Sequence, residues 1–129
     1  MKRLLMGLML LVTAIAASAE WTIAGGNNRY IQYVDTATIR RNGNLVKMWD
    51  LADFKRLQKS AAGMSYLSDK SQSEYDCKEE KQRMLALTNF SGKMGSGKVV
   101  ASNYDPSEWR PIAPESIGEI LWKIACGKQ

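Results

Sequence analysis

The only two cysteines of this 129-residue chain, Cys77 and Cys126, are its best candidates for covalent chemistry. Redox-active cysteines are usually arranged as Cys-x-x-Cys with a lowered thiol pKa, whereas these two lie far apart in the sequence. In a small exported protein, a single pair of cysteines indicates a structural disulfide. We therefore predict a disulfide that closes a loop of about 50 residues and contributes roughly 4 kcal/mol to stability by restricting the unfolded chain.

The patterns that usually supply catalytic chemistry are incomplete. The chain has no histidine, which removes the commonest general base and the commonest metal ligand. Ser60, Ser65 and Ser68 therefore lack the usual activating base, and only a lysine such as Lys59 or Lys70 could replace it. A surface segment is the simpler interpretation of these serines. We therefore predict no catalytic residue and no cofactor. We also predict no metal site, because zinc would need several Cys, His or carboxylate ligands at close spacing.

Two further motifs resemble functional sites but lack the residues that would complete them. Residues 92–98 match the phosphate-binding pattern G-x-x-x-x-G-K, but Val99 follows where Ser or Thr is needed to bind magnesium. A β-branched run also stands where a helix should begin, so we predict a hairpin turn. Glu79 and Glu80 are adjacent, so on a strand they would point to opposite faces and could not share acid–base work.

The beginning of the chain is typical of an export signal. A positively charged start precedes an apolar run at residues 4–16 and a small-x-small cleavage site at residues 17–19. The apolar run has about 13 residues, whereas a membrane span needs roughly 20. We predict a signal peptide over residues 1–19, cleaved after Ala19, and a single domain over residues 20–129.

The remaining composition indicates an exported protein with a mixed surface charge. The chain has 18 Lys and Arg residues and 13 Asp and Glu residues, and the loss of Lys2 and Arg3 leaves a net charge of +3. Basic and acidic residues are interleaved, so we expect a solvated surface and no nucleic-acid partner. No second apolar stretch is long enough for a membrane span, and no cysteine near Ala19 is available for a lipid anchor. We expect a soluble protein in the periplasm or outside the cell.

Most of the chain alternates between apolar and polar residues with a period of two, which predicts antiparallel strands. The expected strands and short extended segments are residues 21–24, 30–35, 38–40, 45–54, 65–77, 81–90, 98–103 and 109–112. An Asn-Gly pair at Asn42 favours a hairpin. We expect a mobile loop at residues 55–63 and a Gly-rich connection at residues 91–97. For the four tryptophans, at residues 21, 49, 109 and 122, core packing is expected for at least two or three, with a binding surface as the alternative.

The C-terminal segment predicts a short amphipathic helix. Ser116 and Glu119 have the spacing of a capping box, and Gly127 suits the position after the last helical residue. The predicted apolar stripe consists of Ile117, Ile120, Leu121, Ile124 and Ala125. A helix of about ten residues is marginal alone, so we expect it to lie on the sheet. Cys126 lies off this stripe, so either the last turn frays to reach Cys77 or the helix end meets the sheet sideways; we favour fraying.

Several short segments, taken in order, resemble the surface-adhesin protein E-like family of bacterial exported proteins. They are residues 33–35, 47–49, 74–77, 81–85, 90–100 and 109–117, followed by Leu121-Trp122 and the final Cys126. The resemblance implies a curved antiparallel sheet of about six strands, with a C-terminal helix packed on its concave face and tied by the disulfide. The founding member of the family is a lipid-anchored surface adhesin that binds host extracellular-matrix proteins and can dimerise, so the resemblance implies a binding protein. This chain departs from that member because it lacks the lipidated cysteine.

We therefore predict an α+β fold and an exported, non-enzymatic binding module. The expected partner is a protein of the host matrix or the bacterial envelope, and a homodimer is an open alternative. The contact surface would be the sheet face or the loops at residues 55–63 and 91–97, with binding residues unassigned. The alternative function is a soluble periplasmic housekeeping or inhibitor-type protein with a target in the bacterial envelope.

Overall fold

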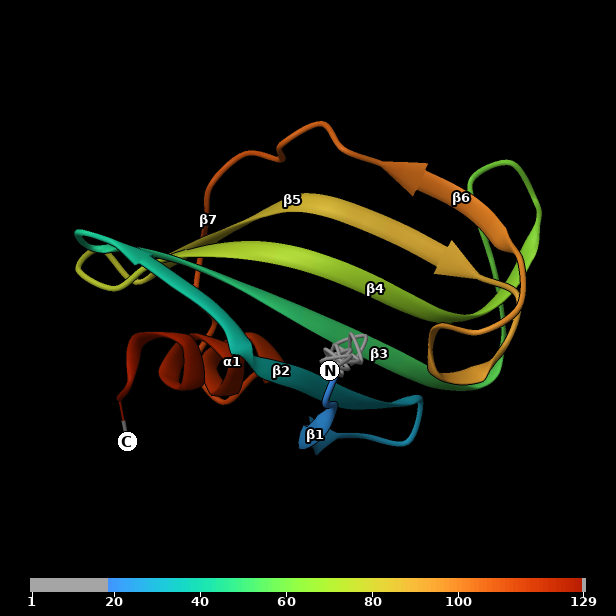
Figure 1. The fold of residues 1–129 in the computed structure, drawn as a ribbon, viewed down its shortest axis with the longest axis horizontal. Helices are drawn as coiled ribbons and strands as arrows, with labels where there is room; N and C mark the ends of the chain where they lie inside the picture. Colours follow the sequence, from blue (N-terminus) through green and yellow to red (C-terminus); the bar gives the residue numbers. More distant parts are fainter. Residues whose placement is uncertain (1–18, 129) are drawn as a thin grey trace, which may run out of the picture.

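The structure is a computed structural model that describes residues 19–128, so all of the predicted signal peptide except Ala19 lies outside the described residues. One antiparallel sheet curves around a single C-terminal helix (Figure 1). The elements are β1 (Thr22–Gly26), β2 (Tyr30–Asn42), β3 (Leu45–Lys59), β4 (Ser65–Asp76), β5 (Lys81–Phe90), the 3₁₀ turn η1 (Lys93–Gly95), β6 (Val99–Asn103), β7 (Arg110–Pro111) and α1 (Ile117–Cys126).

The strands follow one another across the sheet in chain order from β1 to β6, and the short β7 pairs with β5. Every pairing is antiparallel, as expected for strands joined by short turns. This arrangement confirms the predicted fold class of an α+β protein with an antiparallel sheet and one C-terminal helix. The predicted count of about six strands is also correct, with β7 as a short addition.

Two of the predicted strand segments, residues 30–35 and 38–40, are one continuous strand, β2. The pairing of β2 with β3 is irregular between Asp35 and Arg40. The Thr38 hydroxyl spans this irregularity, since it donates to the Asp35 carbonyl at 2.6 Å and accepts from the Trp49 amide at 2.9 Å. Such irregularities bend a strand and increase its twist, which suits a sheet that curves over a helix.

The prediction of a mobile loop at residues 55–63 is wrong. The strand β3 continues to Lys59, and its last residues pair with β4 through Gln58–Tyr66 and Lys59–Ser65. Only a tight turn remains, in which the Ser60 amide donates to the Met64 carbonyl at 2.8 Å. The polar composition of this segment reflects an exposed strand end, where period-two burial no longer distinguishes a strand from a loop.

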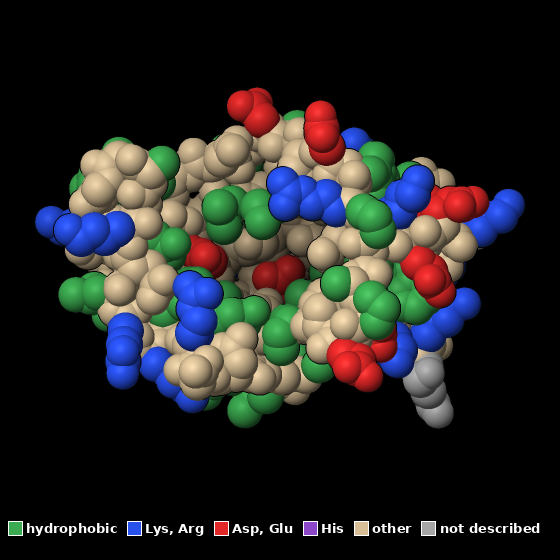
Figure 2. All heavy atoms as spheres, turned by 180° about the vertical axis from the view of Figure 1, so that it is seen from behind, with side chains coloured by type: hydrophobic (Ala, Val, Ile, Leu, Met, Phe, Trp, Pro, Cys, Tyr) green, Lys and Arg blue, Asp and Glu red, His purple; other side chains and the backbone are tan. Residues whose placement is uncertain are grey.

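The hydrophobic core lies between α1 and one half of the concave face of the sheet. The sheet contributes Val34, Val46, Met48 and Tyr75, and the helix contributes Leu121, Trp122, Ala125 and Cys126. The Trp122 indole N–H also donates to the Asp76 carbonyl at 2.9 Å. The helix therefore lies on the sheet as predicted, but it leaves the other half of the face uncovered, where a hollow is visible (Figure 2).

The side of the helix that faces the sheet only partly overlaps the predicted apolar stripe: Leu121 and Ala125 are buried, and Ile117 and Ile124 are half-buried against the core. The buried helical residues are Leu121, Trp122, Ala125 and Cys126, whereas Ile120 of the predicted stripe is 38% exposed. The helix is thus rotated by about a quarter turn from the predicted orientation. The physical reason is the indole of Trp122, which is the largest side chain of the helix and needs both burial and a hydrogen-bond acceptor.

This rotation also removes the expected need for fraying at Cys126, and that prediction is wrong. The helix remains intact through Cys126, and Gly127 follows in the left-handed conformation with φ 67°. The amide of Lys128 donates to the Lys123 carbonyl at 2.8 Å, which completes the cap. Cys126 faces the sheet on the buried side of the helix, so it reaches Cys77 without unwinding.

The start of α1 is capped by a hydroxyl. The Ser116 hydroxyl accepts from the Glu119 amide at 3.1 Å. The Glu119 carboxylate accepts from the Glu115 amide at 3.3 Å, one residue before the position that a reciprocal capping box would use. Glu119 also pairs with Lys123 at 3.1 Å on the same side of the helix.

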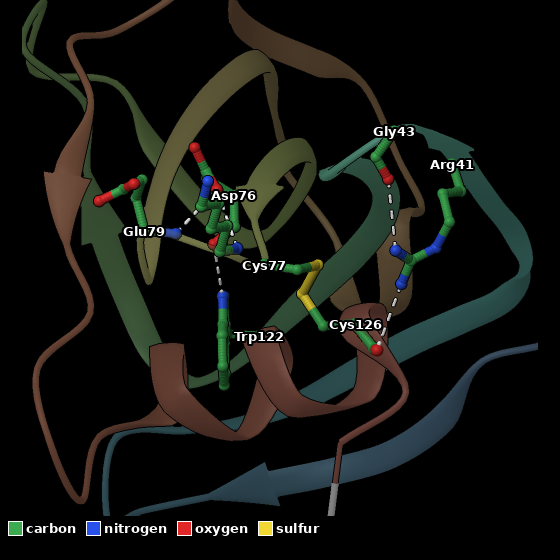
Figure 3. The surroundings of a disulfide bond; sticks show 8 residues. Arg41, Gly43, Asp76, Cys77, Glu79, Trp122 and Cys126 are labelled. Atoms are coloured by element: carbon green, nitrogen blue, oxygen red, sulfur yellow. Dashed lines mark hydrogen bonds between the residues drawn. A yellow bond between two sulfur atoms is a disulfide. The ribbon is translucent and has the colours of Figure 1, made fainter.

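The disulfide joins the end of α1 to the turn that follows β4, and the predicted pairing of Cys77 with Cys126 is confirmed (Figure 3). The two Cα atoms are 5.7 Å apart. The Arg41 guanidinium adds a second contact here, since it donates to the Cys126 carbonyl at 3.3 Å and to the Gly43 carbonyl at 3.3 Å. The helix end is thus held by both the β2–β3 and the β4–β5 turns.

Loss of the disulfide should destabilise the protein. The variants Cys77→Ser, Cys126→Ser and the double variant should each lower the free energy of unfolding by about 2–4 kcal/mol, because the unfolded chain regains its freedom. Denaturant unfolding under oxidising conditions measures this, and reduced wild-type protein should unfold at the midpoint of the double variant. An unchanged midpoint in all three variants would show that the bond contributes nothing.

Candidate functional site

The half of the concave face that α1 leaves uncovered is lined by polar side chains. Alternation along the paired strands places Gln32 of β2, Asp50 of β3, Ser71 and Asp69 of β4 and Asn89 of β5 on this face. Seen from the side of the helix, the face is hollowed, with acidic side chains at the bottom of the hollow (Figure 2). We call this region the polar hollow.

Asp50 lies at the boundary between the apolar core and the polar hollow. It stands opposite Val34 on one neighbouring strand and Ser71 on the other, and it is 7% exposed. The Gln32 side-chain amide donates to its Oδ1 atom at 3.0 Å. Burial raises the pKa of Asp50 to about 7; the hydrogen bond from Gln32 opposes this rise and the negative charge of Asp69 adds to it.

Asp69 is the second carboxylate of the polar hollow. It stands opposite Ala52, so it is diagonal to Asp50 across the β3–β4 pair, at a backbone separation of about 7–8 Å. Burial raises the pKa of Asp69 to about 6. Its Oδ1 atom is buried and has no hydrogen-bond partner among residues 19–128. Within the same residues, neither carboxylate forms an ion pair with a lysine or arginine.

Tyr75 connects the core to the polar hollow. Its side chain is fully buried, and its ring belongs to the core beneath α1. Burial raises the pKa of its hydroxyl, and the charge of Asp50 raises it further, which places the hydroxyl within the field of that carboxylate. The Ser73 side chain opposes this rise in pKa, but in the part of the chain that the structure describes no partner meets normal hydrogen-bond geometry with this hydroxyl.

Three aromatic rings, one each from β2, β3 and β4, pack against one another. The rings of Tyr30 and Phe54 meet edge to face with centroids 5.6 Å apart, and those of Phe54 and Tyr66 do so at 5.8 Å. Burial raises the pKa of Tyr66; the charge of Asp69 adds to this effect and the charge of Arg29 opposes it. The polar hollow therefore combines two carboxylates with an aromatic wall.

These groups are suited to binding more than to covalent chemistry. A carboxyl group with a pKa near neutrality can either donate or accept a hydrogen bond. The sequence has no histidine, and residues 19–128 contain no group of three or more His, Cys, Asp or Glu side chains that could hold a metal ion. The arrangement can recognise hydrogen-bond donors on a ligand.

The serines singled out by the sequence do not meet in one site. Ser68 is fully buried, where its hydroxyl donates to the Gly92 carbonyl at 2.6 Å and accepts from the Gly95 amide at 2.9 Å. Ser65 begins β4, and Ser60 lies in the β3–β4 turn. Ser68 thus fastens the connection after β5 onto the sheet and is not placed as a nucleophile.

The G-x-x-x-x-G-K segment is the connection between β5 and β6, as predicted. It contains η1 and leads into a strand, where a phosphate-binding loop would lead into a helix. The amide of Met94 donates to the Asp53 carboxylate at 2.9 Å, which fixes the turn against β3. Glu79 and Glu80 lie in the turn after β4, outside any strand, and Glu80 has a positive φ of 52°.

The expectation that at least two or three tryptophans pack in the core is wrong. Only Trp122 is buried, and the other three are half-buried. Lys70 lies over the rings of Trp21 and Trp49, at 5.9 Å and 5.2 Å from their centroids. These residues alternate away from the polar hollow, so they stack on the opposite, convex face of the sheet.

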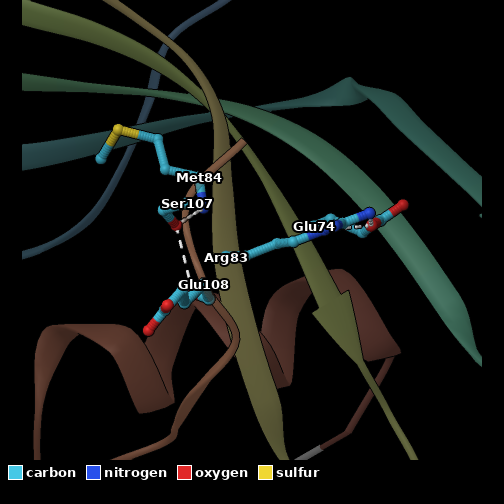
Figure 4. Close-up of polar contacts among 5 residues, drawn as sticks. All are labelled: Glu74, Arg83, Met84, Ser107 and Glu108. Carbon is cyan, nitrogen blue, oxygen red and sulfur yellow. Dashed lines mark hydrogen bonds and ion pairs between the residues drawn. The ribbon is translucent and has the colours of Figure 1, made fainter. Parts of the chain in front are cut away.

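Trp109 belongs to a cluster that fastens the segment before β7 to β5. The Arg83 guanidinium stacks over the Trp109 ring at 4.7 Å and pairs with the Glu74 carboxylate at 2.7 Å. Ser107 bonds twice to Met84, since its hydroxyl accepts from the Met84 amide at 2.9 Å and its own amide donates to the Met84 carbonyl at 2.8 Å (Figure 4). This cluster positions the chain that leads into α1.

The sequence reasoning missed the acidic residues of the polar hollow. One signal was present: Asp50 interrupts the otherwise apolar alternation of Val46, Met48, Ala52 and Phe54 on one face of β3. A single acidic residue on an apolar strand face marks either a register error or a buried polar site. Its neighbour Asp69 carried no such signal, because β4 is polar on both faces.

The fold is that of an α+β domain, an open antiparallel sheet with one helix on half of its concave face. The chain matches the family model of surface-adhesin protein E over residues 21–127. It therefore belongs to the surface-adhesin protein E family, and the resemblance found in the sequence is confirmed. Membership of an adhesin family favours a non-enzymatic binding protein.

Solved structures show the same fold. Crystal form II of Haemophilus influenzae protein E is similar with a TM-score of 0.62 and 12% identity, covering 86% of this chain and 97% of that chain. Protein E from non-typeable Haemophilus influenzae gives a TM-score of 0.63 and 12% identity, covering 87% and 78% respectively. No curated protein matches the chain. Among the described residues, no helix is long and apolar enough to cross a membrane.

The raised pKa of Asp50 predicts a stability that falls as pH rises. The folded protein keeps a proton up to about pH 7 that the unfolded chain releases near its ordinary pKa of 3.8. The free energy of unfolding should therefore fall through this window, by an amount on the order of 2–4 kcal/mol from this group. The variant Asp50→Asn keeps an oxygen for Gln32 but cannot ionise, so its stability should change less with pH.

Urea denaturation at acidic and at mildly alkaline pH measures this difference. Asp50→Asn should be more stable than the wild type at mildly alkaline pH. Asp105→Asn, on the exposed connection after β6, should show the same change of unfolding free energy with pH as the wild type. If the unfolding free energies of Asp50→Asn and the wild type changed equally with pH, the raised pKa of Asp50 would be contradicted.

Proposed function

We propose that this chain is an exported, non-enzymatic module that binds another protein, with host extracellular-matrix proteins as the first class of target. The single observation that carries the proposal is the match to the surface-adhesin protein E family over residues 21–127. In this proposal residues 1–19 direct export and are removed after Ala19, which leaves residues 20–129 as one domain.

The end of the molecule around the β3–β4 turn is the best candidate for the protein contact. Leu57 is 64% exposed and Met64 is 53% exposed, and Met94 of η1 is 39% exposed. Exposed apolar side chains of this size favour contact with another protein. Leu57 and Met94 belong to the two connections at residues 55–63 and 91–97 that the sequence marked as contact surfaces, and Met64 directly follows the first of them, which is mostly strand.

The alternative is a periplasmic protein with a housekeeping or inhibitory role on a target in the bacterial envelope. The observation that favours it is Glu20, which stands after the predicted cleavage site where a lipoprotein would have a cysteine. Protease added to intact cells discriminates between the two proposals. Cleavage of the protein in intact cells supports display on the surface, and cleavage only after the outer membrane is opened supports the periplasmic alternative.

Binding to an immobilised host-matrix preparation tests the contact surface. Wild-type protein at micromolar concentration should bind, and the double variant Leu57→Ser/Met64→Ser should bind about tenfold or more weakly because it loses apolar contact area. Ile23→Ser is a matched control, since Ile23 is 68% exposed on the edge strand β1. Absence of binding to both matrix and envelope preparations would contradict the proposed function, whereas equal loss in both variants would contradict only the chosen surface.

A further inference from the structure

The carboxylates of the polar hollow are left without the partners that buried carboxylates normally have. Burial of an ionised carboxylate is unfavourable unless it is paired or fully hydrogen-bonded. Among residues 19–128, Asp50 accepts one side-chain hydrogen bond, from Gln32, and the buried Oδ1 atom of Asp69 accepts none. The only ion pairs in these residues are Arg83–Glu74 and Lys123–Glu119, both away from the hollow.

The hydroxyl of Tyr75 is an independent observation at the same place. The side chain is 0% exposed, and its hydroxyl has no partner among the described residues. Tyr75 alternates onto the same face as Ser73, Ser71 and Asp69, and its hydroxyl lies within the field of Asp50. Buried polar groups are almost always satisfied, so two unsatisfied atoms on one face, the Tyr75 hydroxyl and the Asp69 Oδ1 atom, point to a group that is absent from the free protein.

The aromatic rings indicate what that group would carry. Phe54 packs edge to face against both Tyr30 and Tyr66, and the charge of Asp69 acts on the Tyr66 hydroxyl. Aromatic faces attract cations, and they also pack against apolar stems. A metal ion does not fit, because the residues that the structure describes contain no set of three or more suitable ligands.

We propose that the polar hollow binds an organic cation, an ammonium or guanidinium group on a short apolar stem, between Asp50 and Asp69. The cationic head donates hydrogen bonds to the two carboxylates, with the Tyr75 hydroxyl on the Asp50 side, and the stem lies along Tyr30, Phe54 and Tyr66. The head supplies the missing donors and neutralises the repulsion between the two carboxylates. Two sources have this chemistry, a free amine and the side chain of a lysine or arginine in a polypeptide.

This site does not rest on the proposed function. It lies on the concave face, whereas the proposed protein contact uses exposed apolar residues at the β3–β4 turn and η1. Failure of one proposal therefore leaves the other unaffected.

Titration calorimetry on the protein purified from the exported fraction tests the site. The probes are cadaverine, a free diamine, and N-acetyl-lysine amide, which presents a lysine side chain. The diol with the same chain length as cadaverine is the neutral control. If only cadaverine binds, the ligand is a free amine. If the lysine derivative binds at least as tightly as cadaverine, the ligand is a side chain of a polypeptide. Both results support an organic-cation site, with no heat expected from the diol.

Matched variants place the binding in the polar hollow. Asp50→Asn and Asp69→Asn keep the shape of each side chain but remove its charge, so each should weaken cation binding by about 10- to 100-fold. Asp105→Asn, which removes an exposed carboxylate of the connection after β6, should bind like the wild type. If a variant fails to fold, amide chemical shifts of the wild type serve instead. Addition of cadaverine should then shift the amide resonances of Gln32, Ser71 and Asn89.

Three results would overturn the proposal. The first is no binding of either cation, and the second is equal binding of the diol. The third is binding that survives in both Asp50→Asn and Asp69→Asn, or that moves amide resonances only outside the concave face.

Discussion

The contact between α1 and one half of the concave face is the constraint on which the rest of the structure depends. A ten-residue helix is marginal in isolation, so its stability must come from the residues it buries. Four of its residues are buried against the sheet, and the disulfide and the Arg41 contact hold its last turn. The half of the sheet beneath the helix can be apolar because the helix is always present to cover it.

The uncovered half of the same face must instead be polar, because no helix covers it. An open apolar face of this size would be a site of aggregation, and the sheet avoids it by changing to Asp, Ser, Gln and Asn side chains where the helix ends. Asp50 marks this change, since Met48 before it on β3 belongs to the core. The raised pKa of Asp50 is a consequence of this position, because it lies at the edge of an apolar core and beside a second carboxylate.

Local sequence patterns predicted the elements of this fold but not the surfaces between them. The strands, the helix and its Ser116 cap follow from spacing and residue type within short windows, and the Cys77–Cys126 pair follows because the chain has only two cysteines. The rotation of α1 does not, because it depends on whether Trp122 finds an acceptor at Asp76, 46 residues earlier in the chain. The meeting of Asp50 and Asp69 was equally out of reach, since diagonal neighbours are set by the register of two strands and neither strand alone specifies that register.

Family membership and the polar hollow answer different questions about this chain. A shared fold at 12% identity shows that the sheet and its helix are retained, and it carries no information on which side chains line the face. Tyr75 shows why the face must be considered residue by residue, because one side chain serves both halves. Its ring is part of the core beneath α1, and its hydroxyl lies toward Asp50. A ligand bound at Asp50 would therefore lie near a residue that also supports the helix, so occupation of the hollow and docking of α1 share a physical link.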